Sequence, residues 1–217
     1  EIFERNLQQV YAQTDQMFLW LLQGQWLFAI AVAVVRSPYT WSGTERSVHP
    51  HVFVALLLGG LLNVMPVVLI RLAPGWWLTR QSIAVAQVMW SAILIHITGG
   101  RIETHFHVFG SLAFLAFYRD WRLLVTATLT VSADHLVRGF FWPDSVYGIA
   151  NPEWWRFIEH ASWIAFEDVV LVLGCHRALS DMRGTADREA ELAEINGNIE
   201  TQVRERTEEL RDNMERY

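Results

Sequence analysis

The stretch HITGGRIETHFHVFG, residues 96–110, decides how this chain is interpreted. It stands between two apolar runs, yet it holds three histidines, one glutamate and one arginine within twelve positions. Charged side chains inside a bilayer cost about 2.5–3.5 kcal/mol each on insertion scales, and they usually face a helix-bundle interior or a cavity. The stretch therefore indicates a polar site built into apolar surroundings.

Apolar blocks surround this stretch along most of the chain. The chain has 217 residues, of which 52% are hydrophobic and 13% aromatic, and a membrane-crossing helix needs about 20 mostly apolar residues. We therefore predict an all-α protein, a six-helix transmembrane bundle followed by a cytoplasmic coiled-coil helix. The predicted membrane helices are residues 17–35, 51–72, 81–98, 104–118, 123–141 and 154–175.

A charged segment, residues 177–217, follows the apolar blocks and holds seven arginines and eleven acidic residues. Such a segment belongs on the cytoplasmic side, where arginine-bearing loops also tend to lie. With six crossings, we expect both termini in the cytoplasm and a multi-pass protein of the inner membrane. The chain begins without methionine and ends within the charged helix, so we expect it to be a piece of a longer protein.

Ionisable residues gather at the predicted outer ends of the last four membrane helices. Imidazole and carboxylate groups are the ligands of zinc, iron and similar cations, so we expect a metal ion there. Zinc or iron is favoured; copper is a further candidate, although copper(I) would call for sulfur and Cys175 lies at the opposite end. The expected ligands are His96, Glu103, His107, His135 and His160.

Helical spacing ranks these residues. Glu103 and His107 are four apart and share a face, whereas His105 is rotated by about 200° from His107, so His107 ranks above His105. Asp134 and Arg138 are also four apart and predict an ion pair, which leaves His135 as the freer ligand. Residues expected as additional ligands or as partners of ligands are His105, Asp134, Glu159 and Glu167. A purely structural polar network is the alternative to a metal site.

The charged tail has its own periodicity. Apolar residues recur in steps of three and four from Leu192 through Ile195, Ile199, Val203 and Leu210 to Met214, with Arg206 where another apolar residue would fall, which is typical of a coiled coil. We therefore expect a parallel homodimer that forms through this segment. A single solvated helix is the alternative.

Three motifs and the tail resemble parts of a known class of protein. GGRIETHFHVFGSLAFLAFYRDWRLL, ADHLVRGFFWPDSVYG and EHASWIAFED resemble the multi-helix membrane sensor regions of bacterial sensor histidine kinases and chemotaxis receptors, and IETQVRERTEEL is similar to the coiled-coil linker that precedes a kinase domain. The resemblance implies a transmembrane sensor domain, residues 1–176, and a signalling linker, residues 177–217, of a two-component system.

The resemblance also implies partners. Besides the lipid bilayer and a second copy of the chain, we expect a downstream kinase or another signalling output domain, and no nucleic acid. The 217 residues contain no phosphoacceptor, nucleotide-binding or methylation motif. The chain itself is therefore not expected to be catalytic, and the full-length protein is expected to be a histidine kinase.

Two other functions use histidines in membranes. Di-iron hydroxylases and desaturases have histidine boxes with HxxxH and HxxHH spacing at the cytoplasmic face; neither spacing occurs here, and these histidines are predicted to be external. A haem protein with paired axial histidines is the other alternative, and it ranks below a simple metal ion.

Overall fold

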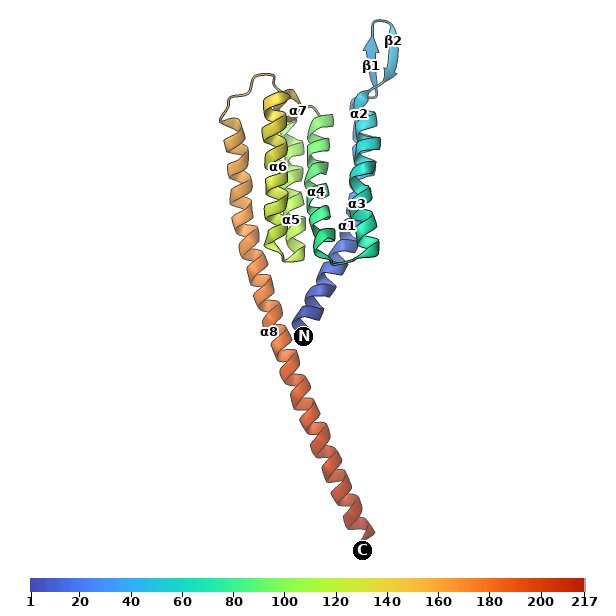
Figure 1. Cartoon of the computed structure of the whole chain (residues 1–217), viewed down its shortest axis with the longest axis vertical. Coiled ribbons are helices and arrows are strands. Elements are labelled where there is room, and N and C mark those ends of the chain that lie inside the picture. The colour runs from blue at the N-terminus through green and yellow to red at the C-terminus, as the bar shows by residue number, and fades with distance from the viewer. Residues whose placement is uncertain (217) are drawn as a thin grey trace.

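Helices make up nearly all regular structure in the computed structural model, which describes residues 1–216 (Figure 1). Tyr217, the last residue of the predicted linker, lies outside the described residues. In chain order the elements are α1 (Ile2–Arg36), β1 (Tyr39–Ser42), β2 (Glu45–Val48), α2 (Pro50–Phe53), the π-helical η1 (Val54–Leu58), α3 (Gly59–Leu72), α4 (Trp77–Ile97), α5 (Ile102–Leu115), the 3₁₀ turn η2 (Ala116–Tyr118), α6 (Trp121–Phe141), α7 (Asp144–Tyr147) and α8 (Arg156–Glu215).

The fold is all-α apart from one hairpin, in agreement with the predicted class. Each of the six apolar segments is helical, but two of the helices extend further than predicted. α1 begins at Ile2 rather than at residue 17, and α8 continues to Glu215. The polar first half of α1 is held to the bundle because Asp15 accepts hydrogen bonds from the Gly75 amide at 2.5 Å and the Tyr118 hydroxyl at 2.6 Å.

The helix α4 lies at the centre of the bundle. It packs against α1, α3, α5 and α6, and 72% of its most apolar stretch is buried, against 28% for α1 and for the helix from Pro50 to Leu72. Polar groups on α4 are paired across helices: the Trp90 indole donates to the Asn63 side chain at 2.8 Å, and Asn63 in turn donates to the Leu22 carbonyl. Central burial explains why α4 has polar residues that a lipid-facing helix would avoid.

A two-stranded hairpin, which the sequence analysis did not predict, projects beyond the bundle between α1 and α2 (Figure 1). The strands pair antiparallel with Tyr39 opposite Val48, and Gly43 has the positive φ of the tight turn. Alternating β-type residues around Ser42 and Gly43 were the available signal.

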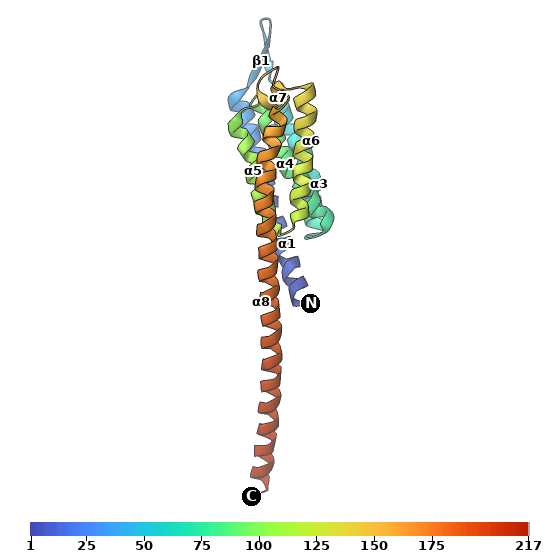
Figure 2. The same cartoon turned by 90° about the vertical axis from the view of Figure 1, so that its left-hand side faces the viewer.

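The long helix α8 packs against α6, α5 and α1 along its first part and then leaves the bundle (Figure 2). The apolar segment 154–175 and the charged tail are therefore joined in one continuous helix. The two chain ends lie on the same side of the bundle, opposite the hairpin (Figure 1).

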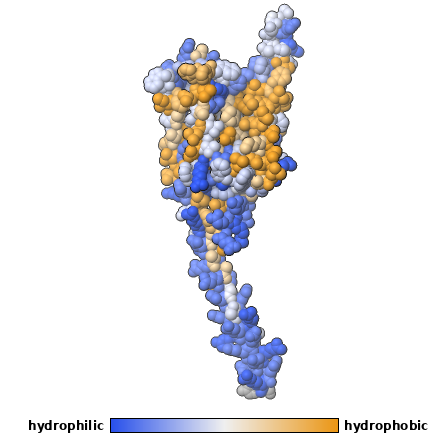
Figure 3. Space-filling view, in the orientation of Figure 1, coloured by the Kyte–Doolittle hydropathy of each residue, from blue (hydrophilic) through white to orange (hydrophobic). Residues whose placement is uncertain are grey.

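Hydropathy separates the bundle from the tail. Hydrophobic surface lies over large parts of the bundle, with hydrophilic patches between them, and hydrophilic surface covers most of the lower part of α8 (Figure 3). Among residues 1–216, three helices are long and apolar enough to cross a membrane: Ile2–Arg36, Pro50–Leu72 and Trp77–Ile97. The chain is therefore a helical protein with apolar candidate spans and a long polar helix at its carboxyl end.

Candidate histidine site

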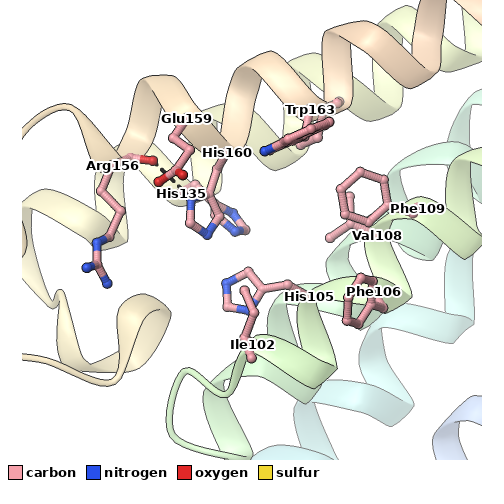
Figure 4. Close-up of a pocket in the computed structure, with 11 residues that line it drawn as sticks. Ile102, His105, Phe106, Val108, Phe109, His135, Arg156, Glu159, His160 and Trp163 are labelled. Carbon is pink, nitrogen blue, oxygen red and sulfur yellow. Dashed lines mark hydrogen bonds between the residues drawn. The ribbon is translucent and has the colours of Figure 1, made fainter.

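Three histidines from three helices meet near the hairpin end of the bundle (Figure 4). His105 of α5 lies 5.6 Å from His135 of α6 and 5.3 Å from His160 of α8, between ring centroids, and His135 and His160 are 6.3 Å apart. His105 and His135 are buried, and His160 is partly buried. These three residues are called the triad below.

Each triad ring is held by the same local contact. The Nδ1 atoms of His105, His135 and His160 lie 2.9, 3.1 and 2.9 Å from the backbone carbonyl oxygen four residues earlier on their own helices. A carbonyl oxygen only accepts hydrogen bonds, so each Nδ1 bears a hydrogen, and in the neutral ring each Nε2 keeps its lone pair. The triad therefore presents three acceptor nitrogens.

One of these nitrogens is buried without a partner. His105 is only 6% exposed, and its Nε2 makes no hydrogen bond to any of the described residues. A buried polar atom without a partner is costly, by about 1–3 kcal/mol, and calls for a missing partner such as a ligand. Nε2 of His105 is therefore the free acceptor of the triad.

A pocket of about 580 Å³ lies against the triad, between α5 and α8. Its wall is largely apolar, and the exposed Ile102, Phe106 and Trp163 stand around it. Tyr147 of α7 lies on the other side of His160, with ring centroids 5.5 Å apart, and burial raises the pKa of its phenol. The residues that line the pocket are Ile102, His105, Phe106, Val108, Phe109, His135, Arg156, Glu159, His160, Trp163 and Ile164.

The triad matches a metal site in its donors more closely than in its spacing. Protein-bound metals take the lone pair of one imidazole nitrogen while the other nitrogen donates to a carbonyl or carboxylate, which is the arrangement of all three rings. With Zn–N distances of about 2.0–2.1 Å, tetrahedral ligand rings would have centroids roughly 5 Å apart, slightly closer than those found here. Within residues 1–216, no group of three or more His, Cys, Asp or Glu stands in a metal-holding arrangement. Metal binding would require His135 and His160 to approach each other by roughly 1 Å.

His107, which the sequence analysis ranked above His105, lies in a different place. Gln25 contacts its Nε2 at 3.1 Å, and Ser91 and Ser111 contact its Nδ1 at 2.7 and 3.2 Å. Both ring nitrogens are thus satisfied by protein groups of α1, α4 and α5. α5 begins at Ile102, before both histidines, so the two rings lie on different faces of this helix, and it is His105 and not His107 that is turned toward α6 and α8.

His96 and Glu103 also lie apart from the triad. The His96 ring packs against His51 and Trp142 at 5.0 and 4.8 Å, in a second pocket. Glu103 is exposed and accepts two hydrogen bonds from the Arg101 guanidinium. Of the five predicted ligands, the structure brings together His135 and His160, and adds His105, which was predicted in a secondary role.

The three remaining carboxylates differ in their relation to the triad. Asp134 lies 3.3 Å from Nδ1 of His135 and forms the predicted ion pair with Arg138 at 2.5 Å. Glu159 lines the pocket beside His160. Glu167 lies two turns further along α8 and is not part of the pocket lining. Asp134 and Glu159 are therefore placed to support the triad, and Glu167 is not.

Two glycine turns fix the helix ends that present the triad. Gly100 precedes α5 and Gly148 lies between α7 and α8, with φ of +72° and +68°. A Cβ built on Gly100 would lie 2.2 Å from the backbone nitrogen of Gly148. Because glycine has no Cβ, the two turns can touch through their backbones, and this contact holds the start of α5 next to the segment that leads into α8.

Comparison with known proteins gives one partial similarity. No protein-family model matches the chain, and no solved structure matches it. Over 87 residues the chain is 34% identical to the transducer protein Htr8 of Halobacterium salinarum. The matched region covers 38% of this chain and 14% of that protein, so the chain spans a small part of the relative's length. The similarity supports a membrane receptor of the transducer kind.

Proposed function

We propose that this chain is the signal-input domain of a transmembrane receptor, in which the triad binds a metal ion and α8 passes the change in occupancy to an output domain. One observation supports this most directly: His160 belongs to α8, which runs as a single helix from Arg156 to Glu215. The partial similarity to a transducer agrees with this reading. A kinase or a chemotaxis signalling domain would be the output.

The proposed membrane placement has six crossings. They are α1, the helix from Pro50 to Leu72, α4, α5 with η2, α6 and the first part of α8. Three of these meet the length and hydropathy expected of membrane spans, and the other three pack beside them. Since both chain ends lie on one side, we place them in the cytoplasm of a cell whose inner membrane holds the bundle, with the triad near the outer leaflet.

The proposed metal ligands are the Nε2 atoms of His105, His135 and His160. Zinc or iron suits three imidazoles, and copper and haem are alternatives that the same measurements distinguish. A bound ion would supply a positive charge that draws the three lone pairs together. Asp134 would keep Nδ1 of His135 in the donor role, and the carbonyls four residues earlier do so for all three rings.

The tail is proposed to form a parallel dimer. Leu192, Ile195, Ile199 and Val203 are exposed along α8, and their spacing suits a coiled coil with a second copy. An isolated helix this polar would be marginal, because most helical stability comes from packing of an apolar face.

Metal content and coil geometry test the proposal together. Elemental analysis of the detergent-purified protein should find one ion per chain in the wild type and in His107→Ala, and none in His105→Ala or His160→Ala. The His107 variant is the matched control, because that residue is two positions from His105 on the same helix, yet its ring bonds only to other protein groups. Equal metal content in all four proteins would remove the site from the triad.

The signalling part has its own readout. Spin labels at Ile199 should change their separation in the dimer when metal is added to the wild type and not when it is added to His160→Ala. An unchanged separation in a protein shown to bind metal would make the site structural and refute the sensing role.

A further inference from the structure

A second pocket, of about 560 Å³, lies on the other side of α6, between α2 with η1, α4 and α6. Its polar end is formed by His49, His51, His96, Arg138 and Trp142. Its remaining wall is apolar and includes Val54 and Leu58 of η1 and Met89 and Ile93 of α4. The π-helical turn η1 forms one side, and such turns are frequent at functional sites.

The histidines of this pocket and those of the triad differ in which ring nitrogen bears the hydrogen. Nδ1 of His49 accepts from the His51 amide at 3.1 Å, so the hydrogen of this neutral ring is on Nε2. Oγ of Ser145 accepts from Arg138 at 2.8 Å and lies 2.9 Å from Nδ1 of His96, to which its own hydrogen can be donated. In that arrangement the hydrogen of His96 is also on Nε2. The second pocket offers N–H donors where the triad offers lone pairs.

The pocket has no spare positive charge. Arg138 donates to both carboxylate oxygens of Asp134, at 2.7 and 2.5 Å, so the guanidinium is neutralised. A phosphate or carboxylate headgroup would gain little binding energy from an arginine that is already paired. A neutral oxygen acceptor could still accept hydrogen bonds from the imidazole N–H groups. The charge balance therefore favours an uncharged ligand with acceptor oxygens.

Aromatic rings give the polar end its shape. The rings of His49, His51, His96 and Trp142 follow one another with centroid separations of 4.2, 5.0 and 4.8 Å, each pair edge to face. Such a row provides planar faces and edges for a further flat ring. Beyond it, the exposed Leu57 and Leu61 continue along the helix surface, where an apolar chain would find lipid-like surroundings.

We propose that the second pocket binds a membrane quinone. The ring carbonyls would accept from Nε2 of His49 and His96, the flat ring would pack against the aromatic row, and the isoprenoid tail would leave along η1 and α3. This inference uses the membrane placement of α2–α3 and α4, which are apolar enough to cross a bilayer. It does not depend on a metal in the triad.

A labelled decyl-substituted benzoquinone, titrated into the protein in quinone-free lipid nanodiscs, tests the proposal. His96→Phe keeps a ring of similar size and removes the N–H donor, and the loss of one hydrogen bond should weaken quinone binding by about tenfold. His105→Phe makes the same change in the triad and should leave quinone affinity unchanged. The unfolding midpoint of each variant confirms that it is folded.

The paired variants separate this proposal from the proposed function. If His105→Phe loses metal and keeps quinone while His96→Phe loses quinone and keeps metal, the two pockets are distinct sites. If the wild type and both variants bind no metal, but only His96→Phe loses quinone, the quinone proposal stands and the metal proposal fails. Three results would overturn the quinone proposal. Quinone binding could fail to saturate, it could be equal in the wild type and His96→Phe, or dodecyl phosphate could displace the quinone at equal concentration.

Discussion

Alanine at Gly100 should destabilise the bundle far more than alanine at Gly99, although the two glycines are adjacent and have almost the same backbone angle. Their φ values are +72° and +73°. Adding a Cβ in this left-handed region costs roughly 1–2 kcal/mol in either position. The two substitutions therefore share their conformational cost, and only the surroundings of the new methyl group distinguish them.

Those surroundings differ sharply. A Cβ on Gly100 would lie 2.2 Å from the nitrogen of Gly148, whereas a Cβ on Gly99 would meet none of the described residues within 4 Å. The atoms in the way are backbone, so they cannot rotate aside, and overpacking of this kind adds about 1–3 kcal/mol. We expect Gly99→Ala to lose about 1–2 kcal/mol and Gly100→Ala to lose about 2–5 kcal/mol.

Reversible unfolding of both variants in mixed micelles measures the difference. The same proteins should also differ in metal affinity, because the contact between the two turns holds the start of α5 next to the entry into α8. Equal losses of stability in the two variants would mean that the turns do not touch, and the account of how the triad is positioned would be wrong.

Three further substitutions test other contacts. Tyr118→Phe removes the hydroxyl that donates to the buried Asp15 at 2.6 Å, and the unfolding free energy should fall by about 1–3 kcal/mol because Oδ1 of Asp15 loses its partner. Asn63→Ala leaves the buried Trp90 indole without its acceptor, and the same measurement should show a loss of about 1–3 kcal/mol. Gly174→Ala adds a methyl group to α8 where none of the described residues lies within 4 Å; it should stabilise the helix by about 1 kcal/mol, and spin labels at Ile199 should still respond to metal.

Segment length and hydropathy were sufficient to predict the helices. Each apolar block is helical in the structure, although residues 104–118 are short for a membrane helix, and no proline after Pro152 interrupts α8. The hairpin after α1 was missed because its two strands have only four residues each and almost all of these are exposed, so the β-type residues Tyr39, Trp41 and Val48 are not part of a buried apolar face. The early start of α1 was missed because hydropathy identifies the part of a helix that lipid covers and not the part that protrudes.

The residue types of the candidate site, and their place near one end of the helices, could be predicted. Which of these residues contact one another could not. Helical spacing tells which residues share a face, as it did correctly for Asp134 and Arg138. It does not tell which neighbouring helix a face meets, and this decides whether His105 or His107 joins His135. The histidines that looked like one set from their position along the chain are therefore divided among the triad, the second pocket and the polar network of His107.

The spacing of the triad and the length of α8 together determine how far the coiled-coil segment would move when metal binds. Ala186 is the last buried residue of α8, and Asn6 of α1 still contacts Glu189, so the helix leaves the bundle close to Ala186. Along the helix, His160 lies about 39 Å before Ala186 and Ile199 about 20 Å after it, at 1.5 Å per residue. Drawing His160 toward His135 by roughly 1 Å, as metal binding would require, tilts the helix by about 1.5° if it turns at Ala186. The same tilt moves Ile199 by about 0.5 Å in the opposite direction. Two copies moving symmetrically would double that displacement, to about 1 Å between paired labels. The wide spacing of the triad is therefore the condition for an output, because a triad already closed in the absence of metal would leave α8 nothing to transmit.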